Sequence, residues 1–455
     1  MRDDISLKVD TSVKGIILLT LPISFSKLIP ELNYLFNAAF LGHLGSKELA
    51  MAGITGVYYL IFSAMGYAIS TALLAIMSRR AGEDNRNAIF STLWHGLLVG
   101  FLIAFCTIGL TYSGIDALLT LSGVDSEGAA MAGSFLKIRI WGLIFLYAYQ
   151  MQNAYLISLQ KSSWLLYGAL GTALINIMLD YALIFGEFGL PELGFDGAAY
   201  ASVISEFVGF AIVFMVIYLS DVTNKYNIHK NWKFVKGTFN LVFTQALPLM
   251  GQYAISTASW WVFFIFVNRN YSVTEQAVSQ AMRNLFGLSG IFTWAFGSAS
   301  NTIISNIIGQ GKLDDIFKTL YKITLISVVG VLFFVAVMNI FPSAFLSLYG
   351  QDEMFLKEGV GPLRIVTMAM VFLCIGIIWL NAVVATGKTV IVFWIELVGI
   401  VSYLLYIWLV MEVFHASHSI AWMSEWLYWT VMMMFSVGYL IWGNWRKDLK
   451  AYEVS

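Results

Sequence analysis

Twelve apolar runs, each about 20 residues or longer, constrain the fold of this chain more than any other feature. They lie near residues 14–41, 47–78, 88–116, 131–159, 163–186, 195–219, 237–268, 276–308, 316–346, 359–386, 389–414 and 419–443. A helix of about 20 apolar residues can cross a bilayer, because it makes all of its backbone hydrogen bonds within the segment. The chain is also 59% hydrophobic and only 12% charged. We therefore expect an all-α polytopic membrane protein with twelve transmembrane helices.

Lysine and arginine are distributed unevenly over the loops that connect these runs. If the N-terminus is cytoplasmic, eighteen of the 26 lie at the termini and on the cytoplasmic side, and only Lys47, Arg269 and Lys357 lie in the opposite loops. Positive residues concentrate in cytoplasmic loops. We therefore expect a multi-pass protein of the bacterial cytoplasmic membrane with both termini in the cytoplasm. The formal net charge of −1 gives no reason to expect a nucleic-acid partner. We expect a monomer surrounded by membrane lipid.

The two halves of the chain resemble each other. Four landmark pairs recur at a nearly constant separation of 226 or 227 residues: Pro22 with Pro248, Ser78 with Ser305, Gly82 with Gly309 and Lys161 with Lys388. We expect a six-helix lobe at 1–219, a cytoplasmic linker at 220–236 and a second six-helix lobe with a short tail at 237–455. Parallel repeats of this kind are typical of transporters, whose binding sites lie near the membrane midplane between or within the lobes.

Several polar residues lie inside the apolar runs at helical spacing. Asn176 and Asp180 are four residues apart in the fifth run, and Gln150 and Asn153 are three apart in the fourth. Residues at these spacings share one face of a helix. An ionisable residue inside a membrane helix is costly to bury, so Asp180 predicts a pathway or a coupling site.

The first run contains a second polar patch. Lys27 and Glu31 are four residues apart on either side of Pro30, which favours a kink, and Asn33 and Asn37 have the same spacing further along. In the second half, the positions that correspond to Asn176 and Asp180 are occupied by Tyr403 and Ile407. This asymmetry places the expected coupling site in the N-terminal half.

Purely structural interpretations of these residues remain open. Lys27 and Glu31 could form an ion pair that neutralises itself, and Gln150 and Asn153 could join helices by hydrogen bonds. Other intramembrane charges could pair with each other, cap carbonyl groups or extend toward the membrane surface; these are Arg139, Arg283, Arg364, Glu206 and Glu396. His415 and His418 are expected to be solvated in an external loop.

Order and spacing of several motifs resemble the multidrug and toxic compound extrusion (MATE) transporters over the whole chain. The segment NIMLDYALIFGEFGLPELGFDGAAYASVIS at 176–205 is similar to the signature between the fifth and sixth helices of that family. PIS at 22–24, FLGHLGSKELA at 40–50, SRRAGE at 78–83 and SNIIGQGK at 305–312 stand where the family has its other landmarks. The resemblance is greatest to the DinF-like branch. It implies a V-shaped pair of lobes that open alternately to the two sides of the membrane, driven by a proton or sodium gradient.

The resemblance also assigns roles to residues of the N-terminal half. Asp180 matches the carboxylate of the fifth helix and Asn176 the amide one turn before it. Asn153 and Gln150 match the amides of the fourth helix, and Ser202 matches a small hydroxyl residue of the sixth. Together with Lys27, these last three are the expected substrate-binding residues.

Two positions depart from the family pattern. Asn37 stands where the first helix commonly has Asp, so a two-carboxylate site requires that Glu31 substitute for it. Ser256 stands where the sodium-linked branch has Glu, which argues against a sodium site in the second half. We therefore expect coupling to protons through Asp180 and Glu31, with Asn37 and Asn176 completing the site.

The expected function is efflux of small amphipathic or cationic compounds by cation antiport, without a bound cofactor. The alternatives are a sodium-coupled drug antiporter, a lipid-linked saccharide flippase of the same superfamily, which would need several cations facing one cavity, and a receptor without transport activity. The chain has no HExxH, GxSxG or P-loop motif, so we do not expect an enzyme.

The charge distribution makes a testable prediction about topology. Single cysteines on the predicted cytoplasmic side, at Lys161, Asn227 and Lys312, should be shielded in intact cells from thiol reagents that do not cross the membrane. Cysteines at Lys47, Glu192 and Glu353 should be labelled. Labelling at Asn227 from outside would overturn the arrangement of twelve spans with both termini in the cytoplasm.

Overall fold

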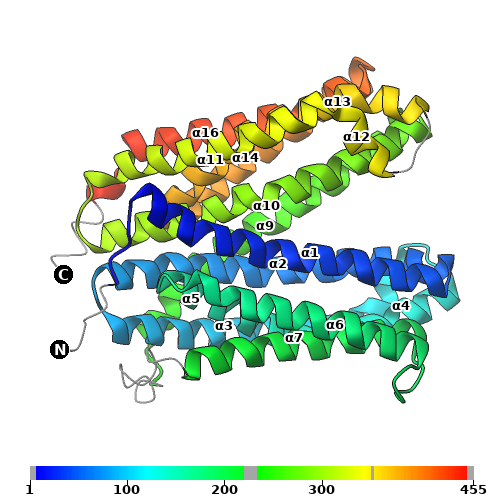
Figure 1. The fold of residues 1–455 in the computed structure, drawn as a ribbon, viewed down its shortest axis with the longest axis horizontal. Helices are drawn as coiled ribbons and strands as arrows, with labels where there is room; N and C mark the ends of the chain where they lie inside the picture. The colour runs from blue at the N-terminus through cyan, green and yellow to red at the C-terminus, as the bar shows by residue number, and fades with distance from the viewer. Residues whose placement is uncertain (1–6, 220–232, 350–352, 448–455) are drawn as a thin grey trace. The chain divides into compact units, whose positions relative to one another are not determined.

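The computed structural model describes residues 7–219, 233–349 and 353–447, and helices are the only regular elements in these ranges (Figure 1). The expected all-α architecture is therefore confirmed. The helices of the N-terminal half are α1 (Val13–Leu44), α2 (Ser46–Gly82), α3 (Arg86–Leu121), α4 (Ser126–Arg139), α5 (Gly142–Ser158), α6 (Leu165–Phe185) and α7 (Gly194–Leu219). The helices α6 and α7, which frame the signature segment, run side by side (Figure 1).

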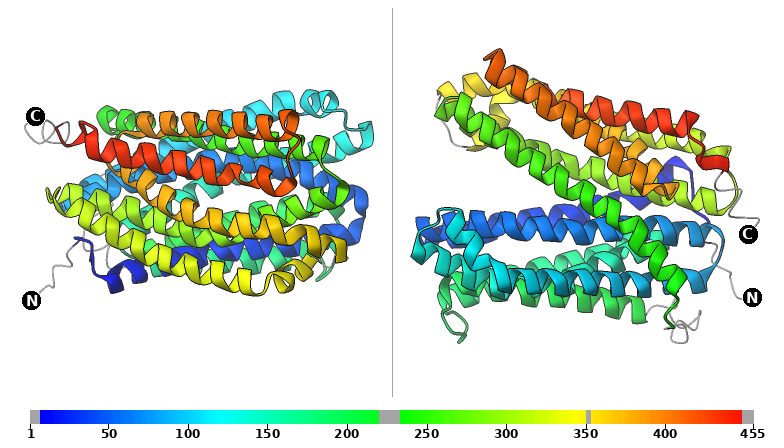
Figure 2. Two further views of the ribbon diagram at one scale, coloured as in Figure 1. Left: turned by 90° about the horizontal axis from the view of Figure 1, so that it is seen from above. Right: turned by 180° about the vertical axis from the view of Figure 1, so that it is seen from behind.

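The C-terminal half repeats the pattern of long helices. Its helices are α9 (Lys236–Asn270), α10 (Val273–Gly309), α11 (Asp315–Ile340), α12 (Pro342–Leu346), α13 (Glu353–Ala385), α14 (Thr389–Trp408), the π-helical η4 (Leu409–Val413), α15 (His418–Trp422) and α16 (Ser424–Trp442). The helices α14 and α16 lie side by side and are drawn in orange and red in Figure 2.

Length and hydropathy support the membrane assignment of most helices. Within the described ranges, nine helices are long and apolar enough to cross a membrane, or ten if α4 and α5 form one bent span. The helices α10 and α16 occupy the two remaining expected segments. The Ser, Thr and Asn residues of α10 and the Ser, Trp and Tyr residues of α16 lower their mean hydropathy, although both are long enough to span a bilayer.

The span made of α4 and α5 bends by 44° after Arg139. The second helix begins at Gly142, where a Cβ atom would overlap both the Arg139 guanidinium and the Glu206 carboxylate. The glycine at the bend leaves room for the charged side chains of Arg139 and of Glu206 on α7.

The chain divides into two compact units. One comprises Met1–Leu7 and Phe25–Met250, and the other comprises Lys8–Ser24 and Gly251–Ser455. The helices α1 and α9, which begin the two sequence repeats, thus each contribute residues to both units. The expected linker at 220–236 lies largely outside the described residues.

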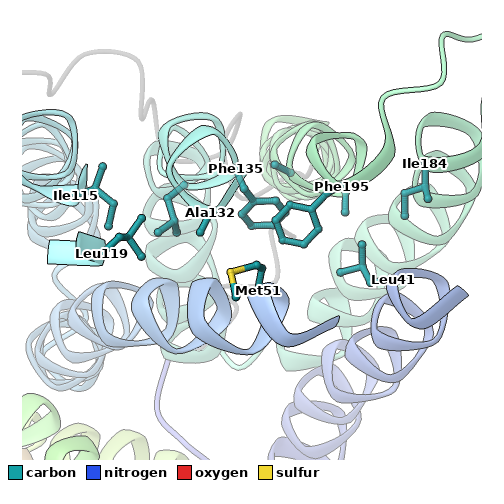
Figure 3. Packing of buried hydrophobic residues seen from close by; sticks show 11 residues of the cluster. Leu41, Met51, Ile115, Leu119, Ala132, Phe135, Ile184 and Phe195 are labelled. Atoms are coloured by element: carbon teal, nitrogen blue, oxygen red, sulfur yellow. The ribbon is translucent and has the colours of Figure 1, made fainter. Parts of the chain in front are cut away.

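A buried apolar cluster joins six helices of the N-terminal unit, α1, α2, α3, α4, α6 and α7 (Figure 3). Phe135 of α4 and Phe195 of α7 form its centre, with ring centroids 4.6 Å apart. Met51 of α2 and Ile184 of α6 pack in the same cluster, next to Leu41 of α1. Packing of Leu41 and Ile184 in one cluster fixes the end of α1 against α6. It thereby sets the register of the polar residues that precede Leu41 on α1 and Ile184 on α6.

Candidate functional site

Asp180 and Asn176 lie on one face of α6 and are among the most buried polar residues of the chain. Their side chains are 0% and 3% exposed. The sequence spacing predicted that they share a helical face, and the structure has them at this spacing within an unbroken helix.

The helix α1 supplies a hydrogen-bond donor to each of these side chains. Asn33 Nδ2 donates to Asn176 Oδ1 at 2.5 Å, and Asn37 Nδ2 donates to Asp180 Oδ2 at 3.2 Å. The donors and the acceptors have the same four-residue spacing, so α1 and α6 make two equivalent contacts one helical turn apart. The structure therefore brings Asn37, Asn176 and Asp180 together, as expected, and adds Asn33.

The remaining polar atoms of this pair of residues are unsatisfied. Asp180 Oδ1 and Asn176 Nδ2 are buried and have no hydrogen-bond partner among the described residues. An ionised carboxylate in this position is expensive because burial removes its hydration while one oxygen lacks a compensating donor. Protonation removes that charge, so the arrangement favours a group that binds and releases a proton.

Lys27 and Glu31 form no ion pair in the described part of the chain. Lys27 Nζ instead donates to the Tyr67 hydroxyl at 2.6 Å and lies 4.2 Å from the centre of that ring. Glu31 is exposed on α1 and makes no hydrogen bond with Asn37 or Asp180 within these ranges. Glu31 therefore does not join the hydrogen bond between Asn37 and Asp180, although the sequence places it in the same expected coupling site.

The other expected polar residues lie on α5 and α7. Gln150 Nε2 donates to the Ser63 carbonyl at 3.4 Å, while Gln150 Oε1 and Asn153 Oδ1 are buried acceptors without a partner among the described residues. Ser202 is partly exposed on α7, and its side chain joins none of the other site residues by a hydrogen bond within the same ranges. Unsatisfied acceptors of this kind are suited to receive donors from a ligand.

A largely buried ion pair lies at the bend between α4 and α5, with side chains that are 13% and 11% exposed. Arg139 binds Glu206 of α7 with both terminal nitrogens, at 2.8 and 2.6 Å. The Tyr59 hydroxyl donates to the same carboxylate at 3.0 Å, and the guanidinium carbon lies 3.5 Å from the centre of the Tyr59 ring. Arg139 also lies within electrostatic range of Asp180. The hypothesis that Glu206 pairs with an intramembrane arginine is confirmed.

One expectation about histidines is wrong. His415 is exposed, but His418 is only 4% exposed and contacts the Ser279 hydroxyl at 2.5 Å. The Trp422 indole also donates to it, at 3.2 Å. The short helix α15 folds this part of the loop back into the C-terminal unit, and a count of polar residues in the loop does not reveal that fold.

Membrane helices in two similar halves, with a carboxylate and amides buried inside one of them, are features of a secondary transporter. The MatE family model matches this chain twice, at residues 22–182 and 248–409, which together make up most of its length. The chain therefore belongs to the MATE family of multidrug and toxin extrusion transporters. It is a multi-pass membrane protein and not an enzyme. The two matches begin 226 residues apart, the separation at which Pro22 and Pro248 recur.

Two relatives and a solved structure illustrate the similarity. The chain is 23% identical over 385 residues to the "Probable multidrug resistance protein NorM" of Thermotoga maritima, covering 83% of this chain and 80% of that protein. It is 23% identical over 326 residues to mouse "Multidrug and toxin extrusion protein 2", covering 69% and 54%. A crystal structure of a MATE protein in complex with MaL6 matches 99% of this chain and 98% of that chain, with a TM-score of 0.84 and 16% identity. This likeness confirms the expected twelve-helix fold.

The Arg139 and Glu206 pair makes a prediction about stability. Glu206→Gln should lower the free energy of unfolding by about 3–5 kcal/mol, because it leaves Arg139 buried without a counter-charge. The double variant Arg139→Met, Glu206→Leu should recover most of that loss, since a buried pair is often replaceable by apolar residues. Thermal unfolding in detergent measures both effects.

A more exposed pair provides the control for this experiment. Lys137 binds Asp116 at 2.7 Å, with side chains that are 33% and 69% exposed. Asp116→Asn should change stability by about 0.5 kcal/mol or less, because water replaces the lost contact. Equal losses for Glu206→Gln and Asp116→Asn would show that burial of the Arg139 pair is not what stabilises this bend.

Proposed function

We propose that this protein exports small amphipathic or cationic compounds in exchange for protons by alternating access. Membership of the MATE family supports drug or toxin extrusion as the general function. The observation that carries the choice of the coupling residue is the environment of Asp180. It is fully buried, accepts one hydrogen bond from Asn37 and has a second oxygen without a partner among the described residues.

The proposed cycle begins with uptake of a proton by Asp180 from the outer side. The neutral acid can donate a hydrogen bond, whereas the carboxylate can only accept one. Asn37 and Asn176 then have to rearrange, and α1 can respond by bending near Pro30. We propose that this rearrangement lowers the affinity for the exported compound, which leaves to the outside before the proton is released to the cytoplasm.

The proposed cycle changes the charge of the Asp180 side chain. Arg139 lies within electrostatic range of Asp180. Because Glu206 already binds Arg139 with both oxygens, Arg139 supplies a fixed field rather than a direct partner for Asp180. The carboxylate therefore stays able to exchange a proton and is not locked in its charged form.

Substrate recognition is proposed for the polar groups near this face. Gln150 and Asn153 offer buried acceptors that suit a cationic or hydrogen-bonding compound. Lys27 and Ser202 belong to the same proposed set of substrate-binding residues. Glu31 is exposed on α1. Its proposed role is to pass protons to and from Asp180, and not to share a proton with it.

The energy available from one proton is sufficient for useful export. A charge that falls through 100 mV supplies about 2.3 kcal/mol, and about 1.4 kcal/mol corresponds to a tenfold concentration ratio. One proton per uncharged substrate therefore sustains a gradient of about fifty-fold from the membrane potential alone. The proposed setting is the bacterial cytoplasmic membrane, with a monomer whose termini are both cytoplasmic.

The flippase alternative requires several free cations facing one cavity. The candidate cations for such a cavity are Lys27, Arg139, Arg283 and Arg364. Arg139 is neutralised by Glu206, and Lys27 donates a hydrogen bond to Tyr67, so two of these four already have partners. For sodium coupling, Ser256 lacks the carboxylate expected in the second half. Proton antiport accounts for these residues more simply.

Replacing the titratable group tests the proposal. Asp180→Asn preserves size and hydrogen bonding but cannot bind the coupling proton. The variant should fold and reach the membrane, yet lose accumulation of a fluorescent lipophilic cation such as ethidium into inverted vesicles energised by a pH gradient. Asp180→Glu should retain part of the activity because it keeps a titratable carboxyl.

Asp116→Asn is the matched control, because it removes an exposed carboxylate from the same unit and should leave accumulation unchanged. Accumulation by Asp180→Asn at the level of the unchanged protein would refute the proposed role. The same experiment with a sodium gradient in place of the pH gradient identifies the coupling ion.

A further inference from the structure

The C-terminal unit contains a buried carboxylate that the proposed cycle does not use. Glu396 of α14 is 1% exposed. Gln252 Nε2 of α9 donates to its Oε2 at 3.0 Å, and the Tyr428 hydroxyl of α16 donates to its Oε1 at 2.5 Å. Ser256, one turn beyond Gln252 on α9, also lies within hydrogen-bonding range. Three helices of one unit therefore converge on this carboxyl group.

No lysine or arginine pairs with Glu396 in the part of the chain that the structure describes. The helix α13 also packs against α14, and after Arg364 its one titratable side chain is Cys374. Lys388 stands at the start of α14, two turns before Glu396. The side chains around the carboxylate are therefore neutral donors, which hold a charge without cancelling it.

Another acidic residue extends the cluster. Glu425 of α16 is 2% exposed and accepts a hydrogen bond from the Trp429 indole at 3.2 Å. It lies within electrostatic range of Tyr428 and of Tyr403. The side chains of Tyr403 and Ser424 are both more than nine-tenths buried, and neither hydroxyl has a hydrogen-bond partner of normal geometry among the described residues. The C-terminal unit thus contains a second buried carboxyl group, on the same helix as the Tyr428 donor.

We infer that Glu396, held by Gln252 and Tyr428, is a second proton-binding site, located in the C-terminal unit and independent of Asp180. The carboxylate takes a proton from the medium to become the neutral acid and returns it when the site reopens. Burial of the Glu396 carboxyl group without a cationic partner among the described residues makes its ionised state costly. A bound sodium ion fits less well, because both Glu396 oxygens already face donor hydrogens rather than converging lone pairs.

Protonation of Glu396 has a defined local consequence. A proton on Glu396 Oε2 would point at the amide hydrogens of Gln252. The Gln252 amide must therefore turn, so that its own oxygen, Oε1, accepts a hydrogen bond from the protonated Glu396. Gln252 lies four residues after Pro248, which removes a backbone hydrogen bond from α9. The same helix passes from one compact unit to the other between Met250 and Gly251. A change in this hydrogen bond therefore acts on α9 about one turn after the position at which the helix lacks a backbone hydrogen bond.

Infrared difference spectroscopy of the purified protein tests the inference directly. A jump from acid to alkaline pH should remove the C=O stretching band of protonated carboxyl groups from the spectrum of the unchanged protein. One component of this band belongs to Glu396 and should be missing from the difference spectrum of Glu396→Gln. Glu412→Gln is the matched control, since Glu412 lies just beyond α14 but is partly exposed and close to Arg269. That variant should keep the component, and so should Asp180→Asn. A spectrum of Glu396→Gln identical to that of the unchanged protein would overturn the inference.

Three further measurements separate proton binding at Glu396 from sodium binding and from a role in coupling. Replacing choline by sodium at constant ionic strength should not change the Glu396 component, and a sodium-dependent loss would contradict a proton site. Tyr428→Phe should displace the pH midpoint at which that component disappears, which keeps the test available if Glu396→Gln does not fold.

In vesicles, loss of one coupled proton should lower the limiting accumulation ratio by about fifty-fold at ~100 mV. Unchanged accumulation, with the spectral component still lost, would confirm the site and exclude it from coupling.

Discussion

The cost of placing a carboxylate inside a membrane helix governs the organisation of the N-terminal unit. Asp180 has no exposed surface, and α1 supplies one amide donor to it. A single neutral donor offsets only part of the lost hydration, so the charged state is tolerated rather than strongly stabilised. The equivalent contact from Asn33 to Asn176 holds α1 in register with α6, so that a change of charge at Asp180 acts on a defined interface.

A different solution to the same cost is found at the bend between α4 and α5. Glu206 is bound by Arg139 and Tyr59, and the absence of a side chain at Gly142 allows the charged groups to approach the backbone closely. This carboxylate is neutralised in place, whereas Asp180 is not. The contrast explains why one acid is suited to stabilising the bend and the other to exchanging a proton.

Much of this arrangement could be predicted from the sequence because helical spacing is local. The spacing of Asn176 and Asp180 predicts a shared face, and the separation of Pro22 from Pro248 predicts the repeat that the family model also matches. Contacts between distant helices are not local. The pairing of Lys27 with Tyr67 rather than Glu31 depends on how α1 is rotated against α2, which the spacing of residues along α1 does not determine.

The sequence identifies other polar residues, such as Glu396 and His418, without showing which side chains surround them. The position that corresponds to Glu396 in the first half is Ala169, so comparison of the halves gives no signal for a carboxylate there. The predicted position of His418 in an external loop indicates a solvated side chain, but α15 turns it inward toward Ser279. In both places the decisive fact is which helix faces which, and that is set by packing across the whole unit.

In the proposed cycle, protonation of Asp180 lowers the affinity for the exported compound, so binding of that compound favours release of the proton. Proton release by the purified transporter in weakly buffered detergent solution, measured as ethidium is added, tests this claim without vesicles or gradients. We expect the unchanged protein to release protons on binding, and Asp180→Asn to release up to one fewer per molecule while still binding ethidium. Undiminished release by Asp180→Asn, with binding intact, would contradict it.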